Sequence, residues 1–202
     1  MKSDFDLEFQ NENIESKIIA ALERVSQAFR VLLWQESKDF SLSPIQVQVL
    51  IFLLHHSKEK GTVSYLASEF NMTKPTISDT IKSLEQKQLI KKIQQQHDTR
   101  SYTIQLTAKG KNIAIKTSLF SKEIKTPVDR LHDDDKENLL LSLMNIIRHL
   151  NQSEVITIQR MCLTCMHYQT SANGQKHFCK LLNQNLHVID LRIDCPEHET
   201  KA

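Results

Sequence analysis

Four cysteines are the residues of this chain whose type and spacing most directly indicate a chemical function. They lie in the last fifth of the 202 residues, at Cys162, Cys165, Cys179 and Cys195. A pair separated by two residues offers two thiolates to one ion from a single tight turn, and two distant cysteines can complete a tetrahedral site when the chain between them folds around it. The sequence therefore predicts a metal centre with these four cysteines as ligands.

Zinc is the preferred metal, because four thiolates that leave no coordination position open are typical of a structural zinc site. An iron-sulfur cluster is the main alternative: it also takes four thiolates, and Pro196 after the last cysteine matches the Cys-Pro of ferredoxin-type motifs. A thiol-disulfide switch and structurally idle cysteines are the remaining alternatives. His167 or His198 could take the place of one cysteine ligand, but neither is preferred.

The segment around the cysteines, residues 153–202, needs stabilisation beyond an apolar core. Its leucine, isoleucine, valine and phenylalanine residues between the second and fourth cysteines are Phe178, Leu181, Leu182, Leu186, Val188, Ile189, Leu191 and Ile193. This number is too small for an independent core, and a structural metal would supply the missing stability.

A thiol oxidoreductase that uses Cys162 and Cys165 is the rival functional class. Such motifs normally open a helix after a strand in a βαβ unit, where the thiolate is stabilised. Here the cysteine pair follows a predicted helix, and no alternating strands surround it. The sequence also lacks a GxGxxG motif, a glycine-rich phosphate loop and a nucleophile-base-acid set. We therefore do not expect an enzyme.

Composition and the N-terminal segment favour a cytoplasmic protein without a membrane span. The segment MKSDFDLEFQ is acidic and lacks the apolar core of a signal peptide, and no stretch approaches the roughly 18 apolar residues that a spanning helix needs. Because the cytoplasm is reducing, two structural disulfides are not expected, and this favours metal binding by the cysteines.

Charge is distributed unevenly along the chain. Residues 1–40 carry five basic and eight acidic groups, whereas residues 41–110 carry nine basic and five acidic groups. A local basic excess is what a nucleic-acid-binding surface requires, although an ordinary solvated surface can give the same count.

Hydrophobic periodicity predicts helices joined by one β-hairpin. Helices are expected at residues 12–34, from Pro44 after the N-cap Ser43, at 62–71, at 73–89, at 107–130 with an interruption at Pro127, and at 133–152. The hairpin is expected from LIKKIQQQ and YTIQL, with the polar turn HDTRS between them. A short helix, a turn, a second helix and a hairpin form the winged helix-turn-helix.

The segments LSPIQVQVL, VSYLASEFNMTKPTISDTIKSLEQKQLI and HDTRSYTIQLTAKG together resemble the MarR family of bacterial winged-helix transcription regulators. The resemblance covers roughly residues 12–152. It implies a mainly helical fold with a small β-hairpin wing, and a homodimer that binds pseudo-palindromic double-stranded operator DNA. The family does not identify a small-molecule effector for this chain.

The resemblance and the element order together suggest four parts. They are an N-terminal dimerisation helix at 1–40, a winged helix-turn-helix at 41–110, C-terminal dimerisation helices at 111–152 and a cysteine-rich, metal-binding extension at 153–202. The extension lies outside the resemblance.

The recognition helix is expected to bury Ile77, Ile81 and Leu84 and to direct polar residues outward. The predicted DNA-binding residues of this helix are Lys74, Thr76, Ser78, Asp79 and Lys82. They lie mostly in the first two turns, which reach base edges in the major groove.

Arg100, at the predicted hairpin tip, resembles the wing arginine of the family, which enters the narrow minor groove. Asp98 is placed to hold the tip or to orient that arginine. Lys91 and Lys92 are expected to contact the DNA backbone at most, and a solvated strand edge explains them equally well.

Overall fold

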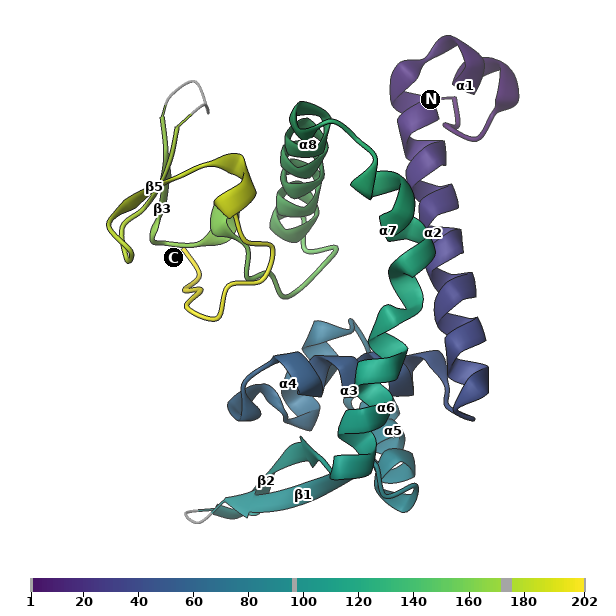
Figure 1. Cartoon of the computed structure of the whole chain (residues 1–202), viewed down its shortest axis with the longest axis vertical. Helices are drawn as coiled ribbons and strands as arrows, with labels where there is room; N and C mark the ends of the chain where they lie inside the picture. The colour runs from purple at the N-terminus through teal and green to yellow at the C-terminus, as the bar shows by residue number, and fades with distance from the viewer. Residues whose placement is uncertain (1, 96–97, 172–175, 202) are drawn as a thin grey trace.

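The computed structural model describes residues 2–95, 98–171 and 176–201, except for the side chains of residues 95 and 98–101. Figure 1 shows a long N-terminal helix along one side, a winged helix-turn-helix at one end, and a C-terminal extension packed beside the last long helix. In the described part of the chain, no helix is long and apolar enough to cross a membrane.

The winged helix-turn-helix contains three helices followed by a hairpin. Its elements are α3 (Pro44–His55), the 3-10 turn η1 (Lys58–Lys60), α4 (Val63–Glu69), α5 (Lys74–Gln86), β1 (Ile90–Gln95) and β2 (Asp98–Leu106). The predicted N-cap Ser43 is confirmed, since its side chain accepts a bond from the backbone N–H of Gln46. Thr73 caps α5 in the same way, by accepting a bond from the N–H of Thr76. Such caps satisfy N–H groups that have no partner within the helix.

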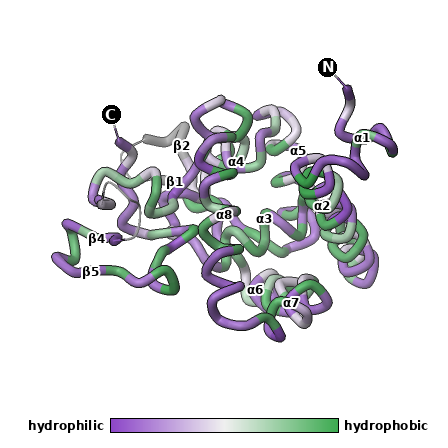
Figure 2. The backbone as a smooth tube through the Cα atoms, turned by 90° about the horizontal axis from the view of Figure 1, so that it is seen from above, coloured by the Kyte–Doolittle hydropathy of each residue, from purple (hydrophilic) through white to green (hydrophobic). Residues whose placement is uncertain are grey.

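A hydrophobic core holds these elements together. Its fully buried side chains include Leu50 of α3, Leu66 of α4, Ile77 and Leu84 of α5, and Ile104 of β2. Figure 2 shows α3 as a largely hydrophobic tube between α5 and α6, whereas α2 has hydrophobic and hydrophilic residues along its length. The predicted buried stripe of the recognition helix is therefore confirmed.

The hairpin is antiparallel and pairs Ile90 with Leu106 and Lys92 with Ile104. Its second strand begins at Asp98, earlier than the predicted YTIQL segment, so residues 98–101 extend the strand instead of forming the turn. The pairing register shifts between Gln94 and Gln95. A β-bulge or similar irregularity places unequal numbers of residues on the two strands, so pairing can resume on the far side of it.

The remaining helices connect the winged helix with the extension. They are α1 (Leu7–Glu12), α2 (Ile14–Asp39), α6 (Ala108–Thr117), the 3-10 turn η2 (Ser118–Ser121), α7 (Lys122–Asp129) and α8 (Asp133–Gln152). The helix predicted at 107–130 was expected to be interrupted at Pro127, and this position was wrong. The interruption is the 3-10 turn η2 between α6 and α7, and Pro127 lies inside α7. The helix at 133–152 is confirmed, with three aspartates in its first turn.

The C-terminal extension forms a small antiparallel sheet that the sequence did not predict. Its elements are the 3-10 turn η3 (Cys162–Thr164), β3 (Tyr168–Thr170), β4 (His177–Cys179), β5 (Gln184–Leu186) and the 3-10 turn η4 (Val188–Asp190), with strand order β3-β4-β5. A second apolar cluster joins the extension to α8 through Met144, Met161, Leu163 and Leu191.

Gly110 provides a test of the packing between α6 and the end of the recognition helix. A Cβ atom at this position would lie 1.8 Å from the carbonyl oxygen of Leu89. That oxygen accepts a bond from the N–H of Thr107, whose hydroxyl caps the N–H of Gly110, so the two backbones are held together. We expect Gly110→Ala to lower the free energy of unfolding by about 3 kcal/mol, the upper end for overpacking.

Urea denaturation measures this effect. Asn112→Ala, at an exposed position of the same helix, is the matched control and should change the free energy of unfolding by less than about 0.5 kcal/mol. Equal unfolding midpoints for the native chain and Gly110→Ala would contradict the close approach of α6 to Leu89.

Candidate DNA-binding helix and cysteine site

The recognition helix α5 presents a polar, exposed face opposite its buried stripe. The predicted DNA-binding residues Lys74, Thr76, Ser78, Asp79 and Lys82 are all exposed in the single chain. The Thr76 hydroxyl lies 2.8 Å from the Thr73 hydroxyl, so this side chain also takes part in the helix cap. Gln46 of α3 donates to the Ser83 hydroxyl at 2.9 Å and helps to fix the roll of α5.

The wing lies beside this helix (Figure 1). Asp98 and Arg100 belong to β2, and their side chains lie outside the part of the chain that the structure describes. Lys92 forms an ion pair with Glu85 of α5 at 2.7 Å, and this bond is the first cause that raises the pKa of the Lys92 amine. Lys92 therefore ties the wing to the recognition helix.

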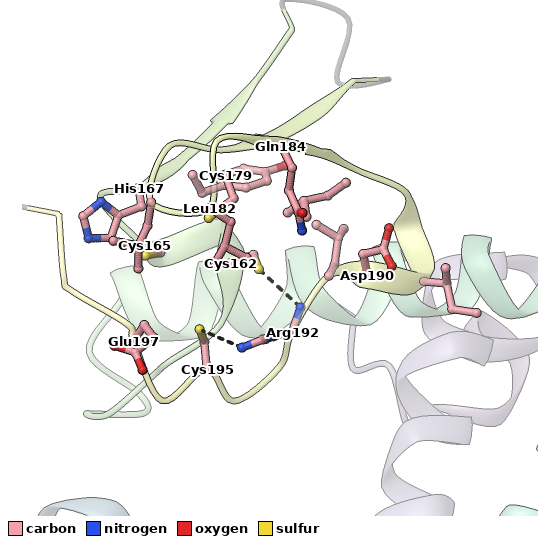
Figure 3. Close-up of a pocket in the computed structure, with 15 residues that line it drawn as sticks. Cys162, Cys165, His167, Cys179, Leu182, Gln184, Asp190, Arg192, Cys195 and Glu197 are labelled. Carbon is pink, nitrogen blue, oxygen red and sulfur yellow. Dashed lines mark hydrogen bonds between the residues drawn. The ribbon is translucent and has the colours of Figure 1, made fainter.

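The four cysteines line a single pocket in the extension, with a volume of about 350 Å³. Cys162 begins the η3 turn and Cys165 directly follows it, Cys179 ends β4, and Cys195 follows η4. Figure 3 shows their sulfur atoms turned toward the same space. The fold therefore brings together cysteines from three separate segments.

Backbone and arginine N–H groups point at two of the sulfur atoms. The backbone N–H of Arg192 donates to the Cys162 sulfur at 3.2 Å, and the Arg192 guanidinium lies 3.7 Å from the Cys195 sulfur. Burial raises the pKa of the Cys162 thiol, the Arg192 N–H acts in the opposite direction, and the other three cysteines raise it further. Donors of this kind stabilise sulfur that carries negative charge.

The donor set fits a four-thiolate metal, because all four thiols are free and share one pocket. Among the described residues, however, no group of three or more His, Cys, Asp or Glu side chains is gathered closely enough to hold an ion. The predicted metal centre therefore requires the segments that carry the cysteines to approach one another around the ion.

The two histidines considered as substitute ligands have different surroundings. His198 accepts or donates a bond with the Thr164 hydroxyl at 3.0 Å and does not line the cysteine pocket. His167 lines the pocket, and its buried Nε2 atom lacks a hydrogen bond, with the Glu199 carboxylate 3.4 Å away. In Figure 3 its ring points away from the four sulfur atoms.

The setting of the cysteine pair differs from that of a thiol oxidoreductase. Cys162 begins a single 3-10 turn that follows an extended segment, instead of opening an α-helix after a strand. The strands of the extension form an antiparallel sheet, without the parallel βαβ unit of such enzymes.

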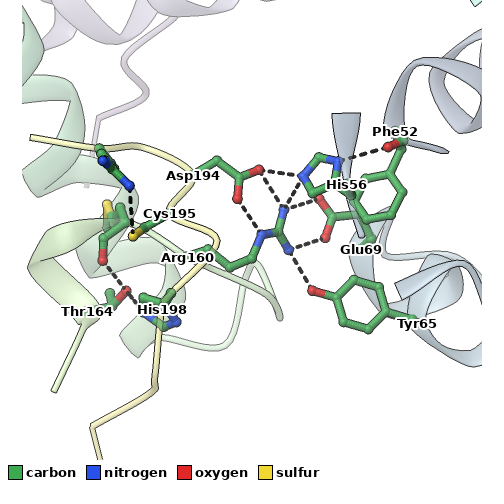
Figure 4. A network of polar contacts seen from close by, with 11 residues as sticks. Phe52, His56, Tyr65, Glu69, Arg160, Thr164, Asp194, Cys195 and His198 are labelled. Atoms are coloured by element: carbon green, nitrogen blue, oxygen red, sulfur yellow. Dashed lines mark hydrogen bonds and ion pairs between the residues drawn. The ribbon is translucent and has the colours of Figure 1, made fainter. Parts of the chain in front are cut away.

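An ion-pair network that the sequence did not reveal joins the extension to the helix-turn-helix (Figure 4). Arg160 binds Glu69 of α4 at 2.7 and 3.0 Å, Asp194 at 2.6 and 3.0 Å, and the Tyr65 hydroxyl at 2.9 Å. His56, at the end of α3, lies 2.7 Å from Asp194. The Arg160 hydrogen bonds lower the pKa of the Asp194 carboxyl to about 2, against the effect of its burial.

A second set of contacts reaches the turn between α4 and α5. The Thr157 hydroxyl donates to the Ser68 carbonyl at 2.6 Å and lies 2.9 Å from the Asn71 side chain. The Asn71 amide donates to the Val155 carbonyl at 3.1 Å. The segment 155–160 is therefore bonded to α4 and to the turn before the recognition helix.

Comparison with known proteins identifies relatives of the winged helix-turn-helix part of the chain. The sequence model of the MarR family matches residues 40–101, which include all of the winged helix-turn-helix up to the middle of the wing. No curated protein matches the chain.

Solved structures of MepR from Staphylococcus aureus share this fold. A MepR-DNA complex is 26% identical, with a TM-score of 0.57, and the match covers 65% of this chain and 96% of that chain. MepR in its DNA-binding conformation is 25% identical, with a TM-score of 0.57 and coverage of 66% and 98%. The four cysteines lie beyond the aligned part.

The fold and its exposed recognition helix define a winged helix-turn-helix protein. Residues 40–101 match the MarR family of DNA-binding transcription regulators, and the fold of this part of the chain is similar to that of MepR. The resemblance inferred from the sequence is thus confirmed.

Proposed function

We propose that this regulator binds pseudo-palindromic operator DNA as a homodimer, with α5 in the major groove and the β1-β2 wing in the minor groove. The observation that carries the proposal is the face of α5, which is polar, exposed and held from behind by buried Ile77, Ile81 and Leu84. Lys74, Ser78 and Lys82 supply hydrogen-bond donors and positive charge for bases and phosphates. A comparable fold occurs in the crystallised MepR-DNA complex.

An uncovered apolar face on α2 supports the homodimer. Side chains at steps of three and four along this helix are exposed in the single chain: Ile14 is 63% exposed, Ile18 48%, Leu22 36%, Val25 46% and Phe29 39%. Contiguous apolar patches on one helix face mark interaction surfaces, and a second copy of the chain buries them symmetrically. The same helix is the dimerisation element that the family resemblance implies.

The second part of the proposal is one metal ion per chain, held by Cys162, Cys165, Cys179 and Cys195. Four free thiols that line one pocket support it, and zinc is the preferred ion, with an iron-sulfur cluster as the alternative. Bound there, the ion would cross-link the three segments of the extension. We place the protein in the cytoplasm, where thiols stay reduced.

Selection of duplexes from a random pool, followed by affinity measurements with the purified full-length chain, tests the DNA-binding proposal. We expect selected sites with half-site centres about 10 base pairs apart, because two recognition helices must enter successive major grooves on one face. Affinity should fall steeply with salt, and sedimentation should give a dimer. A monomer at micromolar concentration, or equal affinity for selected and scrambled duplexes, would refute the proposal.

A further inference from the structure

We propose that the C-terminal extension is a latch that couples the state of the cysteine site to the helix-turn-helix, with Arg160 as the positioning residue. The proposal rests on the proposed function, because it requires both a metal at the cysteines and DNA binding by α5. It adds a route, through α4 and the turn before α5, by which one site acts on the other.

The first step of the argument is the backbone that carries two of the cysteines. The N–H of Cys162 donates to the Arg192 carbonyl at 2.9 Å, and the N–H of Cys195 donates to the Arg160 carbonyl at 2.9 Å. Arg160 and Asp194 form a parallel bridge between the two segments. A movement that draws Cys162 and Cys195 toward a common ion therefore moves the backbone of Arg160 and Asp194 as well.

The second step is the contact of this pair with the helix-turn-helix. The guanidinium of Arg160 forms a paired interaction with each of two carboxylates, Asp194 from the extension and Glu69 from α4. Its side chain is only 10% exposed, so solvent screens these bonds less than those of a surface pair. Planar, paired bonds also fix orientation, and Arg160 therefore sets where α4 lies relative to the cysteine segments.

The third step is the attachment at the turn. Thr157 and Asn71 bind each other, and each also binds a backbone carbonyl across the interface. Asn71 has a positive φ of 49° in the turn that connects α4 with α5. The segment after α8 therefore holds the two helices of the DNA-binding motif at their junction.

The fourth step is the anchor at the other end. Met161, Leu163 and Leu191 of the extension pack against Met144 and its neighbours on α8. The extension thus spans from α8 to α4, and Figure 1 shows it on the side of α4 that is away from the wing. The extension can therefore fix the position of the helix-turn-helix (α4 and α5) relative to α8 without covering the exposed face of α5.

Metal binding is expected to tighten DNA binding through this latch. An ion that draws the cysteines together orders the 160–162 and 192–195 segments, and the ordered latch holds α4 and α5 in one arrangement before DNA arrives. Less conformational entropy of α4 and α5 is then lost when DNA binds, so the affinity for DNA is higher. Because coupling between binding sites is reciprocal, DNA should tighten metal binding by the same factor.

The test compares zinc-loaded and zinc-free full-length protein, prepared under reducing, oxygen-free conditions, by fluorescence anisotropy with a selected duplex. We expect zinc to increase the affinity about tenfold, within the range typical of linked sites. Hydrogen exchange at residues 63–72 should slow on zinc binding even without DNA. Arg160→Ala should still bind one zinc ion per chain. In this variant, zinc should change neither the affinity for DNA nor the hydrogen exchange at residues 63–72.

Three further variants make the result specific. Glu69→Gln breaks the same interaction from α4, far from the cysteines in sequence, and should reproduce the loss if Arg160→Ala does not fold. Arg160→Lys should restore only part of the coupling, because one ammonium cannot form two paired interactions. Lys176→Ala removes an exposed positive charge from the extension and should behave as the native chain.

The outcomes separate the latch from the function on which it rests. A chain that binds neither zinc nor a selected duplex overturns both proposals. If the native chain binds zinc, but its zinc-loaded and zinc-free forms bind DNA with equal affinity, the latch alone is overturned. The latch is also overturned if zinc increases the DNA affinity of Arg160→Ala and Glu69→Gln as much as that of the native chain. Weaker DNA binding in the zinc-loaded form refutes the stated preorganisation.

Discussion

Replacing Cys162 and Cys165 with serine is expected to reduce the bound metal from one ion per chain to none. The two residues lie at the start of the η3 turn and directly after it and supply two of the four proposed ligands, and serine hydroxyls do not replace thiolates as ligands of zinc. Apparent binding free energies of structural zinc are about 10–16 kcal/mol and contribute directly to folding. Residues 153–202 should therefore become sensitive to protease, while the winged helix keeps its own core.

Metal analysis and limited proteolysis of the native and variant chains check this prediction. Met166→Ser is the matched control, because it changes an exposed side chain next to Cys165 and leaves the four thiols in place. We expect the control to keep its metal and its protease resistance. Identical digestion patterns for the native chain and the double variant would show that the extension does not depend on the cysteines.

Arg100→Ala is expected to weaken binding to a selected duplex by about 1–3 kcal/mol, with most of the lost discrimination at A·T-rich flanks. The reason is the position of Arg100 in β2, at the wing, together with the narrow, electronegative minor groove that attracts arginine. Substitution of Lys74 or Ser78 in α5 should instead change the preferred bases inside each half-site.

Duplex selection repeated with each variant distinguishes the two roles. Lys176→Ala, which removes a positive charge outside both the winged helix and the predicted dimerisation helices, should keep both the affinity and the sequence preference. Indistinguishable preference profiles for Arg100→Ala and Ser78→Ala would mean that one of these residues has been assigned to the wrong groove.

Local signals predicted the winged helix well. Ser43 and Thr73 cap helices that begin at the next residue, and apolar side chains at Ile77, Ile81 and Leu84 recur with the helical period. Such features depend on neighbours within a few positions, so the sequence shows them directly. The break between α6 and α7 escaped prediction because its four-residue 3-10 turn keeps a helical pattern of polar and apolar residues.

The extension could be predicted only in part. The spacing of the cysteines indicated that they act together, and the structure places all four around one pocket. The short strands β3, β4 and β5 have three residues each, too few for a period of two to be read. The contacts of Arg160 with Tyr65 and Glu69 span more than ninety positions, and no local pattern identifies such partners.

The metal content of the full-length chain, purified without oxygen or chelators, tests most directly the claim that sets this regulator apart from the MepR structures. We predict one ion per chain, with the thiols of Cys162, Cys165, Cys179 and Cys195 protected from alkylation until the ion is removed. Zinc leaves the protein colourless, whereas an iron-sulfur cluster absorbs at about 400 nm and is lost on oxidation. Metal-free protein with all four thiols alkylated in the native state would contradict the claim.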